Sequence, residues 1–287
     1  MTHRTLVSTA TLAEHLDDPR WVVFDCRHDL AAPDAGEALY RASHLPGARF
    51  LHLDRDLAGP MTGQNGRHPL PDAATLAAKL GAAGVRSDTQ VVGYDAQGGM
   101  YAARLWWLLR WMGHEAVAVL DGGWQAWTGE GRALEATAPT ACNRGEVKVA
   151  QAPLAVPVEA LEKDRGGLML IDARAPDRYR GENETLDPVG GRIPGALNRF
   201  FRDNLDANGR YKSPATLRAE WLHLLGGQSP GEVVHYCGSG VSACHNVLAM
   251  EVAGLSGSRL YPGSWSEWCA DRSRPVATGE PRQGEAR

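Results

Sequence analysis

The sequence predicts an α/β fold of two tandem modules, each a mostly parallel β-sheet flanked by helices. Short Val- and Ile-rich runs alternate with helical stretches along the chain, which is the pattern of parallel α/β sheets. The same landmarks also occur twice in the same order. With 287 residues, the chain is long enough for two domains of ordinary size.

The internal repeat rests on five pairs of similar segments. They are WVVFDCR (21–27) with LMLIDAR (168–174), HLPGA (44–48) with RIPGA (192–196), ATLAAKLGAAGV (74–85) with ATLRAEWLHLLGG (215–227), VVGYD (91–95) with VVHYC (233–237), and GGWQAW (122–127) with GSWSEW (263–268). The spacing between partners is nearly constant, which chance does not readily produce. We therefore interpret the chain as two copies of one module.

Each copy contains runs that predict particular elements. Buried strands are expected at 22–25, 90–94, 168–172 and 232–236. The helix that begins near residue 75 is expected to end at Gly81 or Gly84, because glycine is common just after a helix C-terminus. Residues 101–113 contain no helix breaker before the final glycine and predict a helix directly after a strand.

The expected domain boundaries follow from composition. Residues 1–134 form the first module and 154–279 the second. Residues 135–153 hold two prolines and no helical period, so we expect a linker there. The polar, Gly- and Pro-containing end, residues 280–287, is expected to be a loose tail.

Composition limits the classes of function. Apolar residues make up 43% of the chain and charged residues 22%, as in globular proteins, and the net charge of −4 argues against nucleic-acid binding. No run approaches the roughly twenty apolar residues of a membrane span, and the N-terminus does not resemble a secretory signal. Five cysteines without C-x-x-C spacing favour a cytoplasmic protein without disulfides or a zinc site.

The two copies differ where a strand is followed by a helix. The first copy has Asp95 at this position and the second has Cys237. Ligand sites of parallel α/β sheets lie beyond the carboxyl ends of the strands, so Cys237 is our candidate nucleophile. The alternative is a buried structural cysteine. We prefer that alternative for the other four, Cys26, Cys142, Cys244 and Cys269.

The residues after Cys237 suit a bound anion. Glycines at 238 and 240 let the backbone approach a ligand closely. The N–H groups of Gly238, Ser239, Gly240, Val241 and Ser242 can form a concave anion site. A helix expected to begin near Ser242 adds its positive end. Both effects favour the thiolate over the thiol.

Taken together, these motifs resemble the tandem-rhodanese sulfurtransferases, which include 3-mercaptopyruvate and thiosulfate sulfurtransferases. The resemblance covers nearly the whole chain and rests on DCRHD, DARAPDRYRG, HLPGA, RIPGA, GRHPLP, CGSGVSA and LYPGSWSEW. It implies a catalytically inactive first rhodanese module and a catalytic second one, whose Cys237 carries sulfur as a persulfide. It implies neither a metal nor an organic cofactor.

The resemblance also assigns roles to other residues. Arg178 matches the family's arginine for the donor's anionic group, although spacing alone equally fits a surface arginine. Asp56, His68 and Ser239 match an Asp–His–Ser relay proposed for mercaptopyruvate sulfurtransferases, in which Ser239 assists proton transfer. The alternative is a loop histidine bonded to backbone and a serine that merely fills the turn.

The donor is predicted from the loop's charge. The neutral sequence CGSG resembles the mercaptopyruvate type, whereas vertebrate thiosulfate enzymes carry a basic loop. The mercaptopyruvate type usually has a second arginine where this chain has Asp187, and Arg180 and Arg192 are the candidates to replace it. We expect 3-mercaptopyruvate as donor, with thiosulfate:cyanide transfer as the alternative. The implied acceptors are cyanide or a thiol such as thioredoxin or glutathione.

Two rival classes remain. The related dual-specificity phosphatases use Cys-x5-Arg, but Ala243 stands six residues after Cys237, so the arginine that clamps phosphate is missing. A non-enzymatic rhodanese-like binding module is the other possibility. The presence of both Cys237 and Arg178 argues against it.

Overall fold

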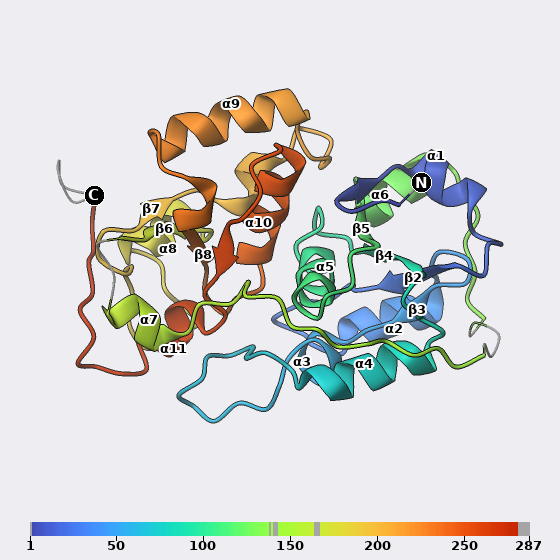
Figure 1. Cartoon of the computed structure of the whole chain (residues 1–287), viewed down its shortest axis with the longest axis horizontal. Coiled ribbons are helices and arrows are strands. Elements are labelled where there is room, and N and C mark those ends of the chain that lie inside the picture. The colour runs from blue at the N-terminus through green and yellow to red at the C-terminus, as the bar shows by residue number, and fades with distance from the viewer. Residues whose placement is uncertain (1, 138, 140–142, 164–166, 281–287) are drawn as a thin grey trace. The chain divides into compact units, whose positions relative to one another are not determined.

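The computed structural model describes residues 2–137, 139, 143–163 and 167–280 (Figure 1). The chain divides into two compact units. Unit 1 comprises Met1–Gly59, Leu70–Ala152 and Ala207–Tyr211, and unit 2 comprises Pro60–Pro69, Pro153–Asp206 and Lys212–Arg287. Cys142 and, apart from Glu280, the expected tail lie outside the described residues.

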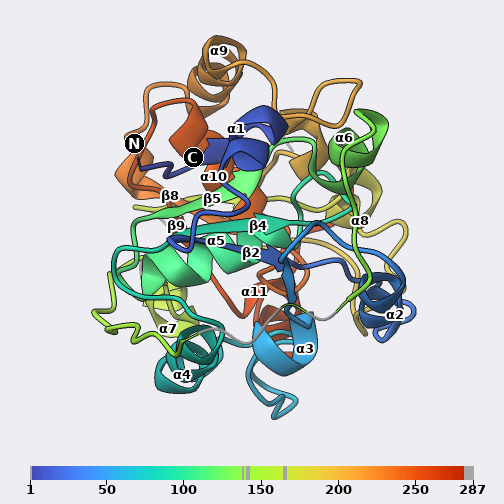
Figure 2. The same ribbon diagram turned by 90° about the vertical axis from the view of Figure 1, so that its right-hand side faces the viewer.

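Unit 1 contains a parallel sheet of five strands in the order β1-β5-β4-β2-β3. The strands are β1 (Leu6–Val7), β2 (Trp21–Asp25), β3 (Arg49–Phe50), β4 (Gln90–Tyr94) and β5 (Val117–Leu120). The helices are α1 (Thr9–Glu14), α2 (Ala35–Ala42), α3 (Leu53–Asp56), α4 (Ala73–Ala82), α5 (Ala102–Trp111) and α6 (Gly123–Gly129). Within this unit, α1 and α6 lie on one side of the sheet and α3 and α4 on the other (Figure 2).

Unit 2 contains a parallel sheet of four strands in the order β7-β6-β8-β9. The strands are β6 (Met169–Asp172), β7 (Leu197–Asn198), β8 (Val233–Tyr236) and β9 (Arg259–Leu260). The α-helices are α7 (Val158–Lys163), α8 (Pro176–Arg180), α9 (Pro214–Leu225), α10 (Ala243–Val252) and α11 (Ser264–Trp268), and Phe201–Asn204 and Pro230–Glu232 form 3-10 helices. Helices α9 and α10 lie on the side of this sheet opposite α7 and α11 (Figure 1).

The central strand of unit 2 shows why the sequence folds this way. All four residues of β8, VVHY, are buried because helices cover both faces of the sheet. Strand β8 pairs with β6 on one side and β9 on the other. The chain then turns and enters α10, which packs back on β8 and β9. This strand–turn–helix unit fixes the position of Cys237.

The two-module prediction is confirmed, since both units are parallel sheets flanked by helices. The strands expected at 22–25, 90–94, 168–172 and 232–236 are β2, β4, β6 and β8. The helix expected to end at Gly81 or Gly84 is α4, which ends at Ala82. None of the helices that the structure describes is long and apolar enough to cross a membrane.

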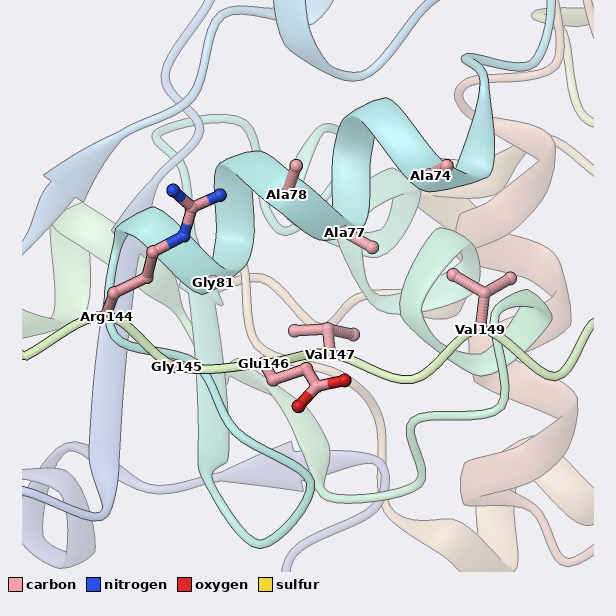
Figure 3. Close-up of a pocket in the computed structure, with 9 residues that line it drawn as sticks. All are labelled: Ala74, Ala77, Ala78, Gly81, Arg144, Gly145, Glu146, Val147 and Val149. Carbon is pink, nitrogen blue, oxygen red and sulfur yellow. The ribbon is translucent and has the colours of Figure 1, made fainter.

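Part of the expected linker packs against unit 1. The N–H of Gly145 donates to the carbonyl of Gly81 at 2.8 Å, and a Cβ at Gly81 would lie 2.7 Å from the Gly145 oxygen. Glycine at 81 therefore permits this close approach. Between α4 and residues 144–149 lies a hollow of about 370 Å³ (Figure 3). Its lining is largely alanine, valine and glycine and contains no cysteine, so it is not the candidate site.

Candidate active site

Cys237 directly follows β8, at the carboxyl end of the sheet. Cys237 is only 2% exposed. The backbone N–H of Gly240 donates to its Sγ atom at 3.2 Å. Helix α10 begins six residues later, at Ala243, with Ser242 as its N-cap residue. The sulfur thus lies at a strand end, in contact with a backbone donor of the loop that leads into a helix.

Glycine at position 240 is required by the shape of this loop. Its φ is +79°, and a Cβ there would lie 2.3 Å from the carbonyl oxygen of Pro262. Any other residue would clash with the backbone that follows β9. The carbonyl of Gly240 in turn accepts a hydrogen bond from the Cys244 thiol at 3.3 Å. Cys244, like Cys26 and Cys269, is buried as expected.

Ser264, which the sequence did not single out, bonds the backbone of Cys237. Its hydroxyl accepts the N–H of Cys237 at 3.1 Å and donates to the carbonyl of Tyr261 at 2.9 Å. Its φ is +55°, a left-handed value that is unusual for residues other than glycine. The matching position of unit 1 is Gly123, with φ +51°. The sequence feature that could have pointed to Ser264 is the difference between the two copies, which have GGW (122–124) in the first and GSW (263–265) in the second.

The corresponding loop of unit 1 already contains an anion. Asp95 is fully buried, and its carboxylate accepts four backbone N–H bonds of 2.7–2.9 Å, from Gln97, Gly99, Tyr101 and Ala102. Burial raises the pKa of Asp95, and these four donors act in the opposite direction. The backbone around Asp95 also matches that around Cys237, because Trp124 N–H donates to the Asp95 carbonyl as Trp265 N–H does to that of Cys237. This loop type can therefore surround a negative group with backbone donors.

His68 and Ser239 lie together in unit 2. Nδ1 of His68 is 2.7 Å from the Ser239 hydroxyl, and both residues are 7% exposed. The backbone N–H of neighbouring Arg67 donates to the Ser266 side chain at 3.0 Å. The third expected member of the relay, Asp56, belongs to unit 1, where it pairs with Lys79 and accepts the N–H of His52.

Arg178 lies on α8, where carboxylates hold it. Its Nη2 donates to Glu184 at 2.8 Å and approaches Asp187 at 3.4 Å. The earlier arginine, Arg174, is buried and pairs with Asp172 at 2.6 Å and Glu184 at 3.3 Å. Arg174 is therefore part of a structural ion-pair network.

The second missed residue is Arg67, in the segment Pro60–Pro69. Its Nη1 pairs with Asp187. A Cβ added to Gly238 would lie 2.8 Å from Nη2 of Arg67 and 3.6 Å from Nη1 of Arg178, so both guanidinium groups lie close to the loop that contains Cys237. The sequence feature that could have pointed to Arg67 is the motif GRHPLP, in which Arg67 directly precedes His68.

Arg180 and Arg192, the expected replacements for a second arginine, have other partners. Arg180 pairs with Glu182 at 2.8 Å and with Glu280 at 3.5 Å. Arg192 donates to the carbonyl of Gly279 at 2.6 Å, and its guanidinium carbon lies 4.6 Å from the centre of the Tyr179 ring. Neither arginine therefore takes the place that Arg67 occupies over Gly238.

Burial and charge act together on the acidic groups near Arg67. Burial raises the pKa of Asp187, although Arg67 opposes the shift. For Glu184, burial also acts to raise the pKa, but backbone N–H groups and Arg178 outweigh it and lower the pKa. Burial, with a smaller contribution from Asp187, raises the pKa of Cys269 to about 11, so its thiol stays protonated at neutral pH.

One group of possible metal ligands occurs in unit 1. Ligand atoms of His28, His52 and Asp54 lie within 4.8 Å of one another. However, Nδ1 of His52 accepts the backbone N–H groups of Asp54 at 3.1 Å and Arg55 at 3.4 Å. The ring proton of a neutral His52 is then on Nε2, where a metal would need a lone pair. This arrangement does not fit a metal ion.

The rhodanese-like domain model matches residues 8–130 and 157–271. The two matches cover most of the chain, one in each copy of the repeat, and the chain therefore belongs to the rhodanese-like domain family.

Proteins similar over the whole chain carry sulfurtransferase names. A probable 3-mercaptopyruvate sulfurtransferase of Pseudomonas aeruginosa is 47% identical, with 98% of this chain and 100% of that protein aligned. A putative thiosulfate sulfurtransferase of Mycobacterium tuberculosis is 39% identical, over 96% of this chain and 98% of that one. The crystal structure of a 3-mercaptopyruvate sulfurtransferase of Escherichia coli is 31% identical, with a TM-score of 0.78, and covers 92% and 99% of the two chains.

Proposed function

We propose that the protein is a sulfurtransferase that moves sulfur from a small anionic donor to an acceptor through a persulfide on Cys237. The observation that carries this proposal is the loop around Cys237, where Gly240 N–H donates to Sγ and two guanidinium groups lie over Gly238. A thiolate nucleophile needs nearby donors, and a donor with an acidic group needs cations. The sulfurtransferase names of the similar proteins support the same reaction.

In the first half-reaction, the Cys237 thiolate attacks the transferable sulfur. An S–S bond forms to Sγ, and the bond that held the sulfur in the donor breaks. With 3-mercaptopyruvate the C–S electron pair leaves on carbon, and the pyruvate enolate must then take up a proton. With thiosulfate the pair leaves on sulfite, which requires no proton. In the second half-reaction, an acceptor takes the outer sulfur and restores the thiolate.

The donor that we favour is 3-mercaptopyruvate, with thiosulfate as the second candidate. The pair formed by His68 and Ser239 supports this choice, because a serine hydroxyl beside an imidazole can pass a proton to an enolate. The CGSG loop also carries no charged side chain. Thiosulfate remains the second candidate because similar proteins named for 3-mercaptopyruvate and for thiosulfate both align along nearly the whole chain.

The acceptors that we propose are cyanide or a thiol such as thioredoxin or glutathione. A thiol acceptor requires a reducing compartment, and we propose the cytoplasm. The small and odd number of cysteines, five without C-x-x-C spacing, supports that choice, because a disulfide framework would need paired cysteines.

The test compares pyruvate release from 3-mercaptopyruvate with sulfite release from thiosulfate, in the wild-type protein and in Cys237→Ser. We expect both reactions to require Cys237 and pyruvate release to be the faster. The matched control is Cys269→Ser, at a buried thiol, which should retain both activities. Turnover that survives Cys237→Ser would overturn the mechanism. Faster sulfite release would reassign the donor only.

A further inference from the structure

Two arginines from distant parts of the sequence meet over the residue that follows Cys237. A Cβ built on Gly238 would lie 2.8 Å from Nη2 of Arg67, and 3.5 and 3.6 Å from the two terminal nitrogens of Arg178. Both arginines belong to unit 2, since Arg67 lies in the segment Pro60–Pro69. An acidic group held by both would lie next to the sulfur nucleophile.

Each of the two guanidinium groups has N–H donors near Gly238 that are not used by its carboxylate partners. Arg67 pairs with Asp187 through Nη1, and Arg178 bonds Glu184 through Nε and Nη2. Nη2 of Arg67 and Nη1 of Arg178 make no hydrogen bond to the residues that the structure describes. Since each terminal nitrogen carries two N–H groups, the pair offers several donors to a ligand above Gly238.

The two arginines and the two carboxylates that hold them, Asp187 and Glu184, form a cluster whose members differ in exposure to solvent. The side chains of Arg67 and Arg178 are 28% and 21% exposed, whereas those of Asp187 and Glu184 are 3% and 4% exposed. The carboxylates therefore lie behind the guanidinium groups and fix their orientation. An anion that arrives from solvent meets the arginines first.

We propose that Arg67 and Arg178 together bind the acidic group of the sulfur donor, and that Asp187 orients Arg67 and sets the donor charge that the site prefers. The inference rests on the proposed function and assigns its specificity. Arg67 is a binding residue, because its Nη2 lies over Gly238, next to Cys237. Asp187 is a positioning residue, because it acts through Arg67 and also contacts Arg178.

The preferred charge follows from the composition of the cluster. Arg67 and Arg178 face the buried carboxylates of Asp187 and Glu184, and Glu184 also pairs with Arg174, whose second partner is Asp172; these three arginines and three carboxylates are formally neutral as a set. A dianion gains less from a neutral cluster than from two arginines without counter-ions. The cluster therefore favours a donor with a single carboxylate, such as 3-mercaptopyruvate, over the thiosulfate dianion.

The first experiment uses Arg67→Lys, which keeps the charge beside Asp187 but removes the planar pair of terminal nitrogens. With 3-mercaptopyruvate as donor, we expect KM to rise about tenfold to a hundredfold with little change in kcat, as for a lost charge-assisted hydrogen bond. The control is Arg218→Gln, an exposed arginine of α9, which should keep the wild-type KM. A KM within about twofold of wild type in Arg67→Lys would overturn the assignment.

If Arg67→Lys does not fold, Arg67→Gln combined with Asp187→Asn removes both charges without leaving a buried carboxylate alone. The same increase in KM is then expected, and an unchanged KM would overturn the proposal. Anion binding is also measured without turnover, by titrating Cys237→Ser, with and without Arg67→Lys, with pyruvate. Weaker pyruvate binding in the double variant supports the arginine pair even if the protein transfers no sulfur, which would refute the proposed function alone.

The second experiment tests Asp187 through donor preference. Asp187→Asn leaves the cluster with one extra positive charge, so the ratio of kcat/KM with thiosulfate to kcat/KM with 3-mercaptopyruvate should rise about tenfold. A purely structural role would lower both values together and leave the ratio unchanged, which would refute the role of Asp187. Asp203→Asn, at an exposed carboxylate of unit 2, is the control and should not change the ratio.

Discussion

Nδ1 of His68 lies 2.7 Å from the hydroxyl of Ser239, two residues after Cys237. Both side chains are buried, so water competes little for this hydrogen bond. One of the two groups must donate and the other accept, and the imidazole can exchange a proton with the hydroxyl. The pair thus places a group that can donate a proton in the loop that contains Cys237, the proposed nucleophile.

This pair should matter for one donor and not for the other. In Ser239→Ala, pyruvate release from 3-mercaptopyruvate should fall by about 10²–10⁴, the usual contribution of general acid–base catalysis. Sulfite release from thiosulfate should fall by less than about tenfold, because sulfite leaves without a proton. Steady-state kinetics with both donors measure the difference, with Ser273→Ala as an exposed control. An equal loss for both donors would mean that Ser239 only shapes the loop.

The backbone of Ser264 predicts an unusual order of stabilities. Alanine cannot relieve the φ of +55° and also loses the bond to the Cys237 N–H, whereas glycine loses the bond but adopts this φ freely. Ser264→Gly should therefore be more stable than Ser264→Ala by about 1–2 kcal/mol. Urea unfolding measures both. Helix propensity alone predicts the opposite order, so a more stable alanine variant would contradict this account.

The anion of unit 1 should be important for stability. In Asp95→Asn, the amide group would face two of the backbone donors that the carboxylate now accepts. Each buried donor left without an acceptor costs about 1–3 kcal/mol, so the free energy of unfolding should fall by about 2–6 kcal/mol. Asp88→Asn, at an exposed position of the same unit, is the control for denaturant unfolding. Similar stability of the two variants would show that the four bonds contribute little.

His235 predicts a loss of stability in acid. Burial on β8 lowers its pKa to about 3, whereas the unfolded chain has the ordinary value of about 6.5. As the pH falls below 6.5, the unfolded state takes up a proton that the folded state refuses. The free energy of unfolding should then decrease by at most about 1.4 kcal/mol per pH unit until the pH nears 3.

The variant His235→Phe removes this titration and keeps a ring beside Trp221, whose centre lies 5.5 Å from that of His235. Its unfolding free energy should depend less on pH between 6.5 and 4 than that of the wild type. His223→Gln, at an exposed position of α9, should keep the wild-type dependence. Parallel pH profiles for wild type and His235→Phe would show that another group titrates.

Cys237 could be singled out from the sequence as the candidate nucleophile because its position follows from a local rule. A buried strand, a glycine turn and a helix place Cys237 at the end of β8, and the repeat pairs it with Asp95. Arg67 could not be located this way, because its role depends on contacts of the segment Pro60–Pro69 with the rest of unit 2. Proximity to Arg178 along the chain favours Arg180 and Arg192 instead, although neither lies over Gly238.

Ser264 could not be identified from the sequence for a different reason. The sign of φ is set by the folded backbone, and a serine in the sequence does not indicate that its φ will be positive. Only comparison with Gly123 in the other copy indicates that this position requires an unusual backbone.

The carboxylate of Asp95 means that the two loops differ in when their negative charge is present. In unit 1 the acidic group is a side chain of the sequence itself, so it is in place from the moment the loop folds. In unit 2 the proposed mechanism places a persulfide on Cys237 at the corresponding position, and that outer sulfur would be present only between the arrival of a donor and its transfer to an acceptor. The loop of unit 1 therefore carries its acidic group permanently, whereas under the proposed mechanism the loop of unit 2 carries its extra sulfur only while a donor is supplied.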